Sequence, residues 1–241
     1  MNRAGSRLFL LLSIATFASR GLVPLPAQTT SPQGPASDQG ADLFGALRSQ
    51  AYSLERQPKN RMLGEVALMI DGGEVAKDDP RLLDLVAHVA TESWDMPVTQ
   101  GIGVINDFPD TRARAAQLLG VIGTAEARAV LFSILRREQN TEVLGPAAMA
   151  IAGIPTDDRQ PTIDILAQRL LQMANTARPD HAFTYALVIA VRTLHEHGGA
   201  ISDPDLYTAL LAVSQGPYPG PIRQLAIDTV LEIRRSNTQG H

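Results

Sequence analysis

The sequence predicts an all-α protein, an α-solenoid of about five to six antiparallel helical hairpins. Apolar residues recur at helical spacing along most of the chain, and no stretch stands out with the alternating pattern of a half-buried strand. Hydrophobic residues make up 44% of the chain but aromatic residues only 5%, which favours a core of Leu, Ile, Val and Ala. A two-helix unit also recurs imperfectly along the chain, which is typical of a stacked repeat.

The clearest copy of this unit covers residues 109–137. Asp110 is a candidate N-cap for its first helix, because a carboxylate accepts hydrogen bonds from the free amides of the first turn. Small residues on the apolar face of that helix allow a neighbouring helix to approach closely. Gly120 and Gly123 bracket the predicted turn, and Thr124 is placed to cap the second helix.

Start signals and apolar periodicity place the other helices in order. The Asp-Pro dipeptides Asp79-Pro80 and Asp203-Pro204 are the strongest of these signals. About eleven helices are expected, over residues 41–55, 61–70, 80–93, 98–106, 110–120, 124–137, 140–153, 160–174, 180–198, 203–213 and 221–235.

The pattern of the first helix returns further along the chain. Ala148, Ile151, Ala152 and Gly153 repeat the register of residues 115–120 at an offset of 33 residues, and a looser copy starts at Pro221. The pattern D-x-R-x-x-A-A-x-x-L-G resembles HEAT repeats, in particular the short HEAT-like type first associated with phycobilisome lyases. This resemblance implies an α-solenoid that binds partner proteins. The motif encodes packing, so it implies no catalytic residues.

Residues 1–27 predict a secretory signal peptide. Two arginines precede the apolar run Leu8–Ala18, which is shorter than the roughly 20 residues of a membrane-spanning helix. Cleavage is expected after Ala27; cleavage after Ala18 and retention as an N-terminal anchor remain alternatives. The expected location is therefore the periplasm or the cell exterior.

The rest of the chain divides by composition. Residues 28–40 lack large apolar side chains and predict a disordered linker, residues 41–235 the HEAT-like solenoid, and residues 236–241 a frayed tail. Residues 1–27 hold three arginines and no acidic residue, so their removal takes the formal charge from −4 to −7. Such an acidic domain is a poor match for nucleic acid or for anionic lipid. The absence of cysteine excludes disulfides, thiolate metal sites and cysteine nucleophiles.

Four residues are candidates for binding a partner. Trp94 is the only tryptophan and lies at a predicted helix break; tryptophan is enriched in binding hot spots, although it also fills gaps between helical hairpins. Arg128, Arg136 and Arg137 lie on or near the second helix of the clearest repeat and are suited to an acidic partner or a peptide carboxylate. The alternative for these arginines is a solvated helical face.

No catalytic, cofactor-binding or metal-binding residues are predicted. His195 and His197 lie two apart and lack the i, i+4 spacing with which two histidines on a helix hold zinc. The acidic loop of residues 71–79 lacks the alternating oxygen ligands of a calcium loop.

These observations predict a non-enzymatic scaffold or adaptor of the bacterial envelope. Its expected partner is another envelope protein or peptide, with no nucleic acid, no membrane span after signal cleavage and no small-molecule ligand. A catalytic HEAT-like protein of the lyase type and a self-associating structural module are the alternatives.

Overall fold

The computed structural model describes residues 37–239, so the predicted signal peptide and linker residues 28–36 lie outside the described part. Residues 37–239 are all-α, as predicted, apart from one short β-hairpin. Ten helices are present in this part of the chain, namely α1 (Ser37–Ala51), α2 (Arg56–Asp71), α3 (Pro80–Asp95), α4 (Pro109–Ile122), α5 (Ala125–Arg137), α6 (Thr141–Gly153), α7 (Gln160–Ala174), α8 (His181–Gly198), α9 (Pro204–Gln215) and α10 (Gly220–Gln239). The hairpin consists of β1 (Thr99–Gln100) and β2 (Gly103–Val104), which pair antiparallel.

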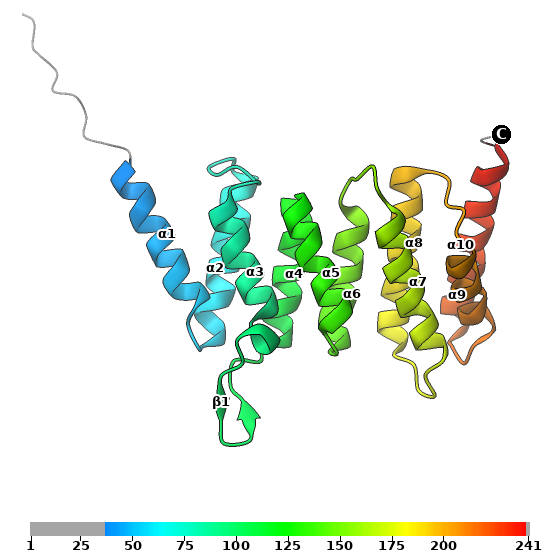
Figure 1. Ribbon diagram of the computed structural model, residues 1–241, viewed down its shortest axis with the longest axis horizontal. Coiled ribbons are helices and arrows are strands. Elements are labelled where there is room, and N and C mark those ends of the chain that lie inside the picture. Colours follow the sequence, from blue (N-terminus) through cyan, green and yellow to red (C-terminus); the bar gives the residue numbers. More distant parts are fainter. Residues whose placement is uncertain (1–36, 240–241) are drawn as a thin grey trace, which may run out of the picture. The chain divides into compact units, whose positions relative to one another are not determined.

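The helices pack in two rows (Figure 1). Each even-numbered helix contacts the next even-numbered one, from α2 to α10, and the odd-numbered helices from α1 to α9 do the same. Consecutive helices run in opposite directions, so each row consists of helices that point the same way.

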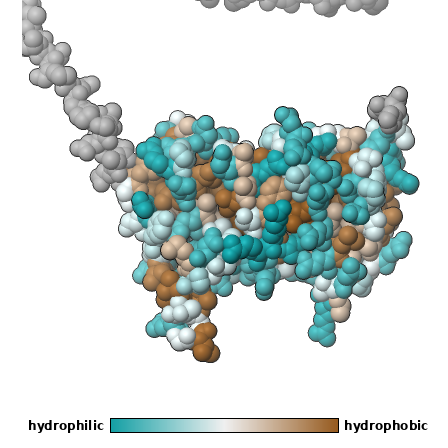
Figure 2. Space-filling view, viewed as in Figure 1, coloured by the Kyte–Doolittle hydropathy of each residue, from teal (hydrophilic) through white to brown (hydrophobic). Residues whose placement is uncertain are grey.

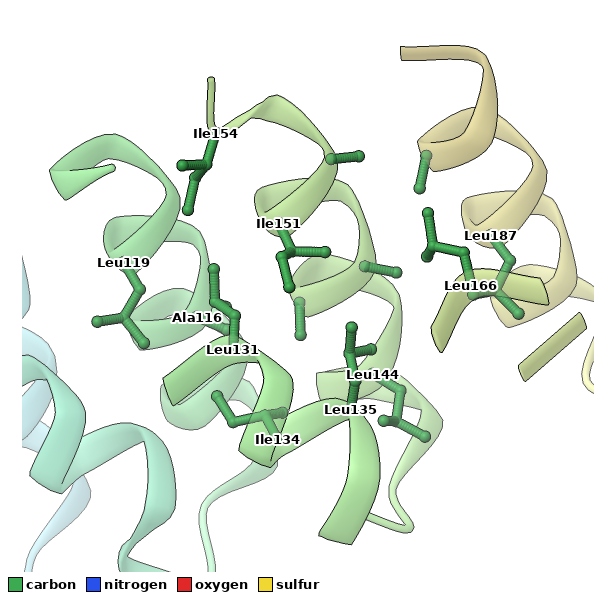
Figure 3. Packing of buried hydrophobic residues seen from close by; sticks show 14 of the residues in the cluster. Ala116, Leu119, Leu131, Ile134, Leu135, Leu144, Ile151, Ile154, Leu166 and Leu187 are labelled. Carbon is green, nitrogen blue, oxygen red and sulfur yellow. The ribbon is translucent and has the colours of Figure 1, made fainter. Parts of the chain in front are cut away.

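The core lies between the two rows and is aliphatic, as the composition predicts (Figure 3). Leu119 from α4, Leu131 from α5 and Leu166 from α7 are completely buried there, and Ile151 from α6 is nearly so. Ala116 lies among these larger side chains and is also completely buried. Each helix therefore buries its apolar stripe against helices of both rows.

Several predicted helix starts are confirmed. In each, a side-chain oxygen of the N-cap residue accepts a hydrogen bond from a backbone N–H of the first turn. The caps that do so are Asp79 for α3, Thr124 for α5, Asn140 for α6, Asp180 for α8 and Asp203 for α9.

The first helix of the clearest repeat differs from the prediction at two positions. Asp110 is not its N-cap: α4 begins at Pro109, and the Asp110 carboxylate binds Arg56 of α2 at 2.6 Å instead. Gly120 lies inside the helix rather than in the turn. Gly123 alone ends α4, with a φ of 69°, in the left-handed region that glycine adopts without strain.

The ends of the array also differ from the predicted bounds. The first helix runs from Ser37 to Ala51 rather than over 41–55. The last helix continues to Gln239 and includes most of the expected tail. Helix ends frequently differ by a residue or two from any assignment, but these differences are larger.

The helix predicted over residues 98–106 is wrong, because this segment forms the β-hairpin. Gly101, with a φ of 64°, makes the turn between β-branched residues that favour strands. Asn106 closes the base of the hairpin: its side chain accepts a hydrogen bond from the Val98 N–H and donates one to the Met96 carbonyl, both at 2.9 Å.

Candidate functional site

A groove of about 750 Å³ crosses the outer side of three even-numbered helices, α4, α6 and α8. We call it the α4–α8 groove. It runs from the C-terminal half of α4 along α6 to the first turns of α8. Six of its fourteen lining residues are glycine or alanine, namely Gly120 from α4, Gly145, Ala150 and Gly153 from α6, and Ala182 and Ala186 from α8.

The groove exists because these small residues bring the helices together and leave little side chain above them. A Cβ atom at Gly120 would lie 2.8 Å from the Cβ and 3.1 Å from the Cα of Ala150. A Cβ at Gly145 would lie 3.4 Å from the Cβ of Ala186. The backbones of α4, α6 and α8 therefore approach one another where the groove has its floor.

Apolar side chains line the groove and remain open to solvent. Val121 and Met149 are 47% and 50% exposed. Pro146 lies inside α6, and its ring nitrogen carries no hydrogen to donate to the carbonyl of Glu142 one turn earlier. The groove thus combines exposed apolar surface with a carbonyl that lacks its usual helical donor.

One end of the groove is acidic. Glu142 and Asp180 lie there, at the N-terminal ends of α6 and α8. The Asp180 carboxylate accepts hydrogen bonds from the Thr141 hydroxyl at 2.6 Å and the Phe183 N–H at 2.9 Å, and these bonds hold the pKa of Asp180 below its usual value. Among the described residues, those that line the groove include these two carboxylates but no Lys, Arg or His.

The four predicted partner-binding residues lie outside this groove. Trp94 and Arg137 do come together: the Arg137 guanidinium lies over the indole ring at 4.2 Å and binds the Asp95 carboxylate at 3.3 Å. Arg128 donates hydrogen bonds to the Thr156 hydroxyl and the Asp158 carbonyl, so it holds the loop between α6 and α7.

Arg136 is exposed, and its guanidinium lies 5.6 Å from the centre of the Phe132 ring. The four residues therefore do not form one surface: two gather at the base of the hairpin, one stabilises a loop, and one faces solvent.

The structure shows a buried ion pair that the sequence analysis did not identify. Lys59 of α2 and Glu92 of α3 are 1% and 3% exposed, and their charged atoms lie 2.5 Å apart. Lys59 also donates a hydrogen bond to the Ala51 carbonyl at 2.9 Å. Burial raises the pKa of Glu92, and the hydrogen bond from Lys59 opposes that rise. The signal in the sequence that could have revealed this pair is the position of each residue on the buried face of its helix.

A second buried cation lies close by. Arg112 of α4 binds Asp107 and, at 3.1 Å, Glu138 at the end of α5. The other carboxylate oxygen of Glu138 accepts hydrogen bonds from the N–H groups of Gln139 and Asn140. This network joins α4 to the loop before it and to the start of α6, and its Arg112 and Glu138 side chains are too buried to meet a ligand.

The histidine pair forms no metal site within α8. His195 is buried, with one ring nitrogen 2.9 Å from the Gly199 carbonyl and the other 3.1 Å from the Ser236 hydroxyl, whereas His197 is exposed. In the described part of the chain, no three His, Asp or Glu side chains gather closely enough to hold a metal ion. Within residues 37–239, no helix is both long and apolar enough to cross a membrane.

Comparison with known proteins identifies no relative: no protein-family model, no curated protein and no solved structure matches the chain. The resemblance to HEAT repeats therefore stays a prediction from the sequence pattern.

Proposed function

We propose that this protein is an exported HEAT-like α-solenoid that acts as an adaptor, holding a segment of another envelope protein in the α4–α8 groove. Two rows of helices, each packed on the next but one, support the solenoid part of this proposal. The basic and apolar composition of residues 1–27 supports export.

The groove is the observation that carries the proposal. Its volume of about 750 Å³ is within the range of sites that bind ligands in preformed concave surfaces. The partly exposed Val121 and Met149 supply apolar area that a bound segment would remove from water, and each such burial is favourable. The floor of glycine and alanine is built from helix backbone, so little has to be ordered on binding.

The lining also indicates which segments fit. Glu142 and Asp180 place negative charge at one end, so a segment with apolar side chains and a nearby Lys or Arg is complementary to the groove. The shallow, small-residue floor suits a helix or an extended chain from a protein better than an enclosed small molecule.

Site-specific photocrosslinking in cells tests this function. A photoreactive residue in place of Met149 should yield a defined adduct with an envelope protein, whereas one in place of Leu211, which is exposed on α9 of the other row, should not. Adducts of the same kind from both positions would contradict the proposal. An adduct between two copies of this chain would instead favour self-association.

A variant that fills the groove, compared with a matched variant outside it, gives a second test. Gly153 lies at the end of the groove, and a Cβ there meets no atom within 4 Å, so Gly153→Leu places a side chain in the groove without a clash at Cβ. Gly64 of α2 is equally open and lies outside the groove. We expect Gly153→Leu to abolish the Met149 adduct and Gly64→Leu to leave it unchanged.

A further inference from the structure

The β-hairpin between α3 and α4 projects beyond the ends of the helices (Figure 1). We call residues 96–106 the finger. Its apolar side chains are open to solvent: Ile102 at the turn is completely exposed, and Met96, Val104 and Ile105 are each exposed by more than a third. Figure 2 shows this hydrophobic surface on the projection. None of these residues lines the α4–α8 groove.

The finger carries no charge. From Met96 to Asn106 the sequence has no Asp, Glu, Lys, Arg or His. The acidic residues on either side are paired at its base, Asp95 with Arg137 and Asp107 with Arg112. The projection therefore presents an uncharged, largely apolar surface above a base of paired charges.

The finger is also held away from the rest of the protein. The side chain of Asn106, at the end of the second arm, is buried and bonds the backbone of the first arm at Met96 and Val98, and the Ile105 N–H donates to the Val98 carbonyl at 2.8 Å. Its apolar side chains thus stay exposed instead of folding back onto the helices. Exposed apolar surface of this kind marks a site of interaction.

From this geometry we infer that the finger inserts into the surface of a zwitterionic lipid bilayer. Both strands are exposed and the turn is apolar, so the finger suits a medium that surrounds it rather than a partner that covers one face. At its base the exposed Arg137 guanidinium stacks on the partly buried Trp94 ring, and a long arginine side chain can place its charge at the headgroup level of a membrane.

The net charge of the protein indicates the charge of the lipid headgroups that the finger can approach. The formal charge of −4 for the full chain, or −7 without residues 1–27, opposes approach to an anionic surface, so the inference concerns neutral headgroups such as phosphatidylcholine. A few apolar side chains give weak, reversible binding, comparable to that of one acyl chain. The finger therefore binds the membrane surface only transiently.

A single fluorescent label tests the insertion in the full chain. The protein has no cysteine, so Ile102→Cys can carry one environment-sensitive dye, and Leu68→Cys, on an exposed position of α2, is the control. With phosphatidylcholine vesicles, we expect a blue shift of the dye at position 102 and none at position 68. Vesicle binding without a shift at position 102 would overturn the inference, because residues 1–27 alone would then account for it.

Substitution of the tip gives a second measurement. Ile102→Ser should lower the vesicle partition coefficient by about tenfold or more, the effect of losing one buried aliphatic side chain. Leu68→Ser should leave it unchanged. A photoreactive residue at position 102 that joins a protein in cells, combined with no dye shift on vesicles, would show that the finger docks on a protein and not on lipid.

Discussion

Two neighbouring parts of the array are held together by opposite means. Between α4, α6 and α8 the contacts include glycine and alanine at close approach, and the helix backbones come nearly into contact at Gly120 and Ala150. Between α2, α3, α4 and α5 the contacts include buried charges, with Lys59 bound to Glu92 and Arg112 bound to Glu138.

The difference determines where the surface is open. Close packing of small residues leaves few long side chains to cover the outer side of α4, α6 and α8, and the groove results. Buried ion pairs restrict how their helices can align, because each charge that has lost contact with water needs its particular partner. The charged part therefore fixes how its helices align, and the small-residue part provides the surface for binding.

Breaking the buried ion pair tests this comparison with the largest expected effect. Lys59→Met leaves the Glu92 carboxylate buried without its partner, and we expect the free energy of unfolding to fall by about 3–5 kcal/mol. Urea unfolding monitored by circular dichroism measures it. Without Lys59, the burial that raises the pKa of Glu92 is opposed only by the charge of Arg112, so the pKa rises further and the loss should be greatest at neutral pH. It should shrink as the pH falls through the raised pKa of Glu92 in the variant, because protonation of the native carboxylate removes the buried charge.

The double variant Lys59→Met, Glu92→Leu is the control. It replaces both charges by apolar groups of similar size, which is often nearly neutral for a buried pair. We expect it to recover most of the stability. If the double variant were as unstable as the single one, the unpaired charge would not be the cause.

The sequence predicted those features that depend on local chemistry. The starts of α3, α5, α6, α8 and α9 were predicted because an N-cap binds amides only two or three residues away. The aliphatic faces were found because helical periodicity is visible within one helix. Both patterns can be recognised in the sequence of one helix, without knowledge of its neighbours.

The features that the sequence did not reveal depend on distant segments. The groove combines small residues of α4, α6 and α8, and none of those helices has a groove by itself. The burial of Lys59 requires Glu92 on the next helix, and Arg128 is bound by a loop that follows α6. The finger did have a local signal, glycines between β-branched residues, but its helical surroundings outweighed it.

A glycine substitution probes the small-residue part with an intermediate effect. A Cβ at Gly120 would meet the backbone of Ala150 at 3.1 Å, which cannot move without shifting α6, so Gly120→Ala should destabilise the protein by about 1–3 kcal/mol. Gly64→Ala, where the Cβ meets nothing within 4 Å, should instead stabilise it by up to about 1 kcal/mol through helix propensity. Thermal unfolding of both variants checks this, and equal shifts in the same direction would contradict the proposed close approach.

The smallest effect is expected at the acidic end of the groove. Asp180 caps α8, and Asp180→Ala should lower the free energy of unfolding by about 1 kcal/mol at pH 7. Because hydrogen bonds from Thr141 and Phe183 lower the pKa of Asp180, its contribution is complete above the ordinary aspartate pKa and is lost as the pH falls through the lowered one.

The gap between Asp180→Ala and the unchanged chain should therefore be constant near neutral pH and narrow below about pH 4. Asp180→Asn keeps the oxygen that accepts the cap hydrogen bond but cannot titrate, so its smaller deficit should likewise narrow in acid as the native carboxylate protonates. Urea unfolding of the three proteins between pH 3 and about pH 7 measures both deficits. A gap that stays constant throughout that range would mean that the Asp180 carboxylate is not stabilised by these bonds.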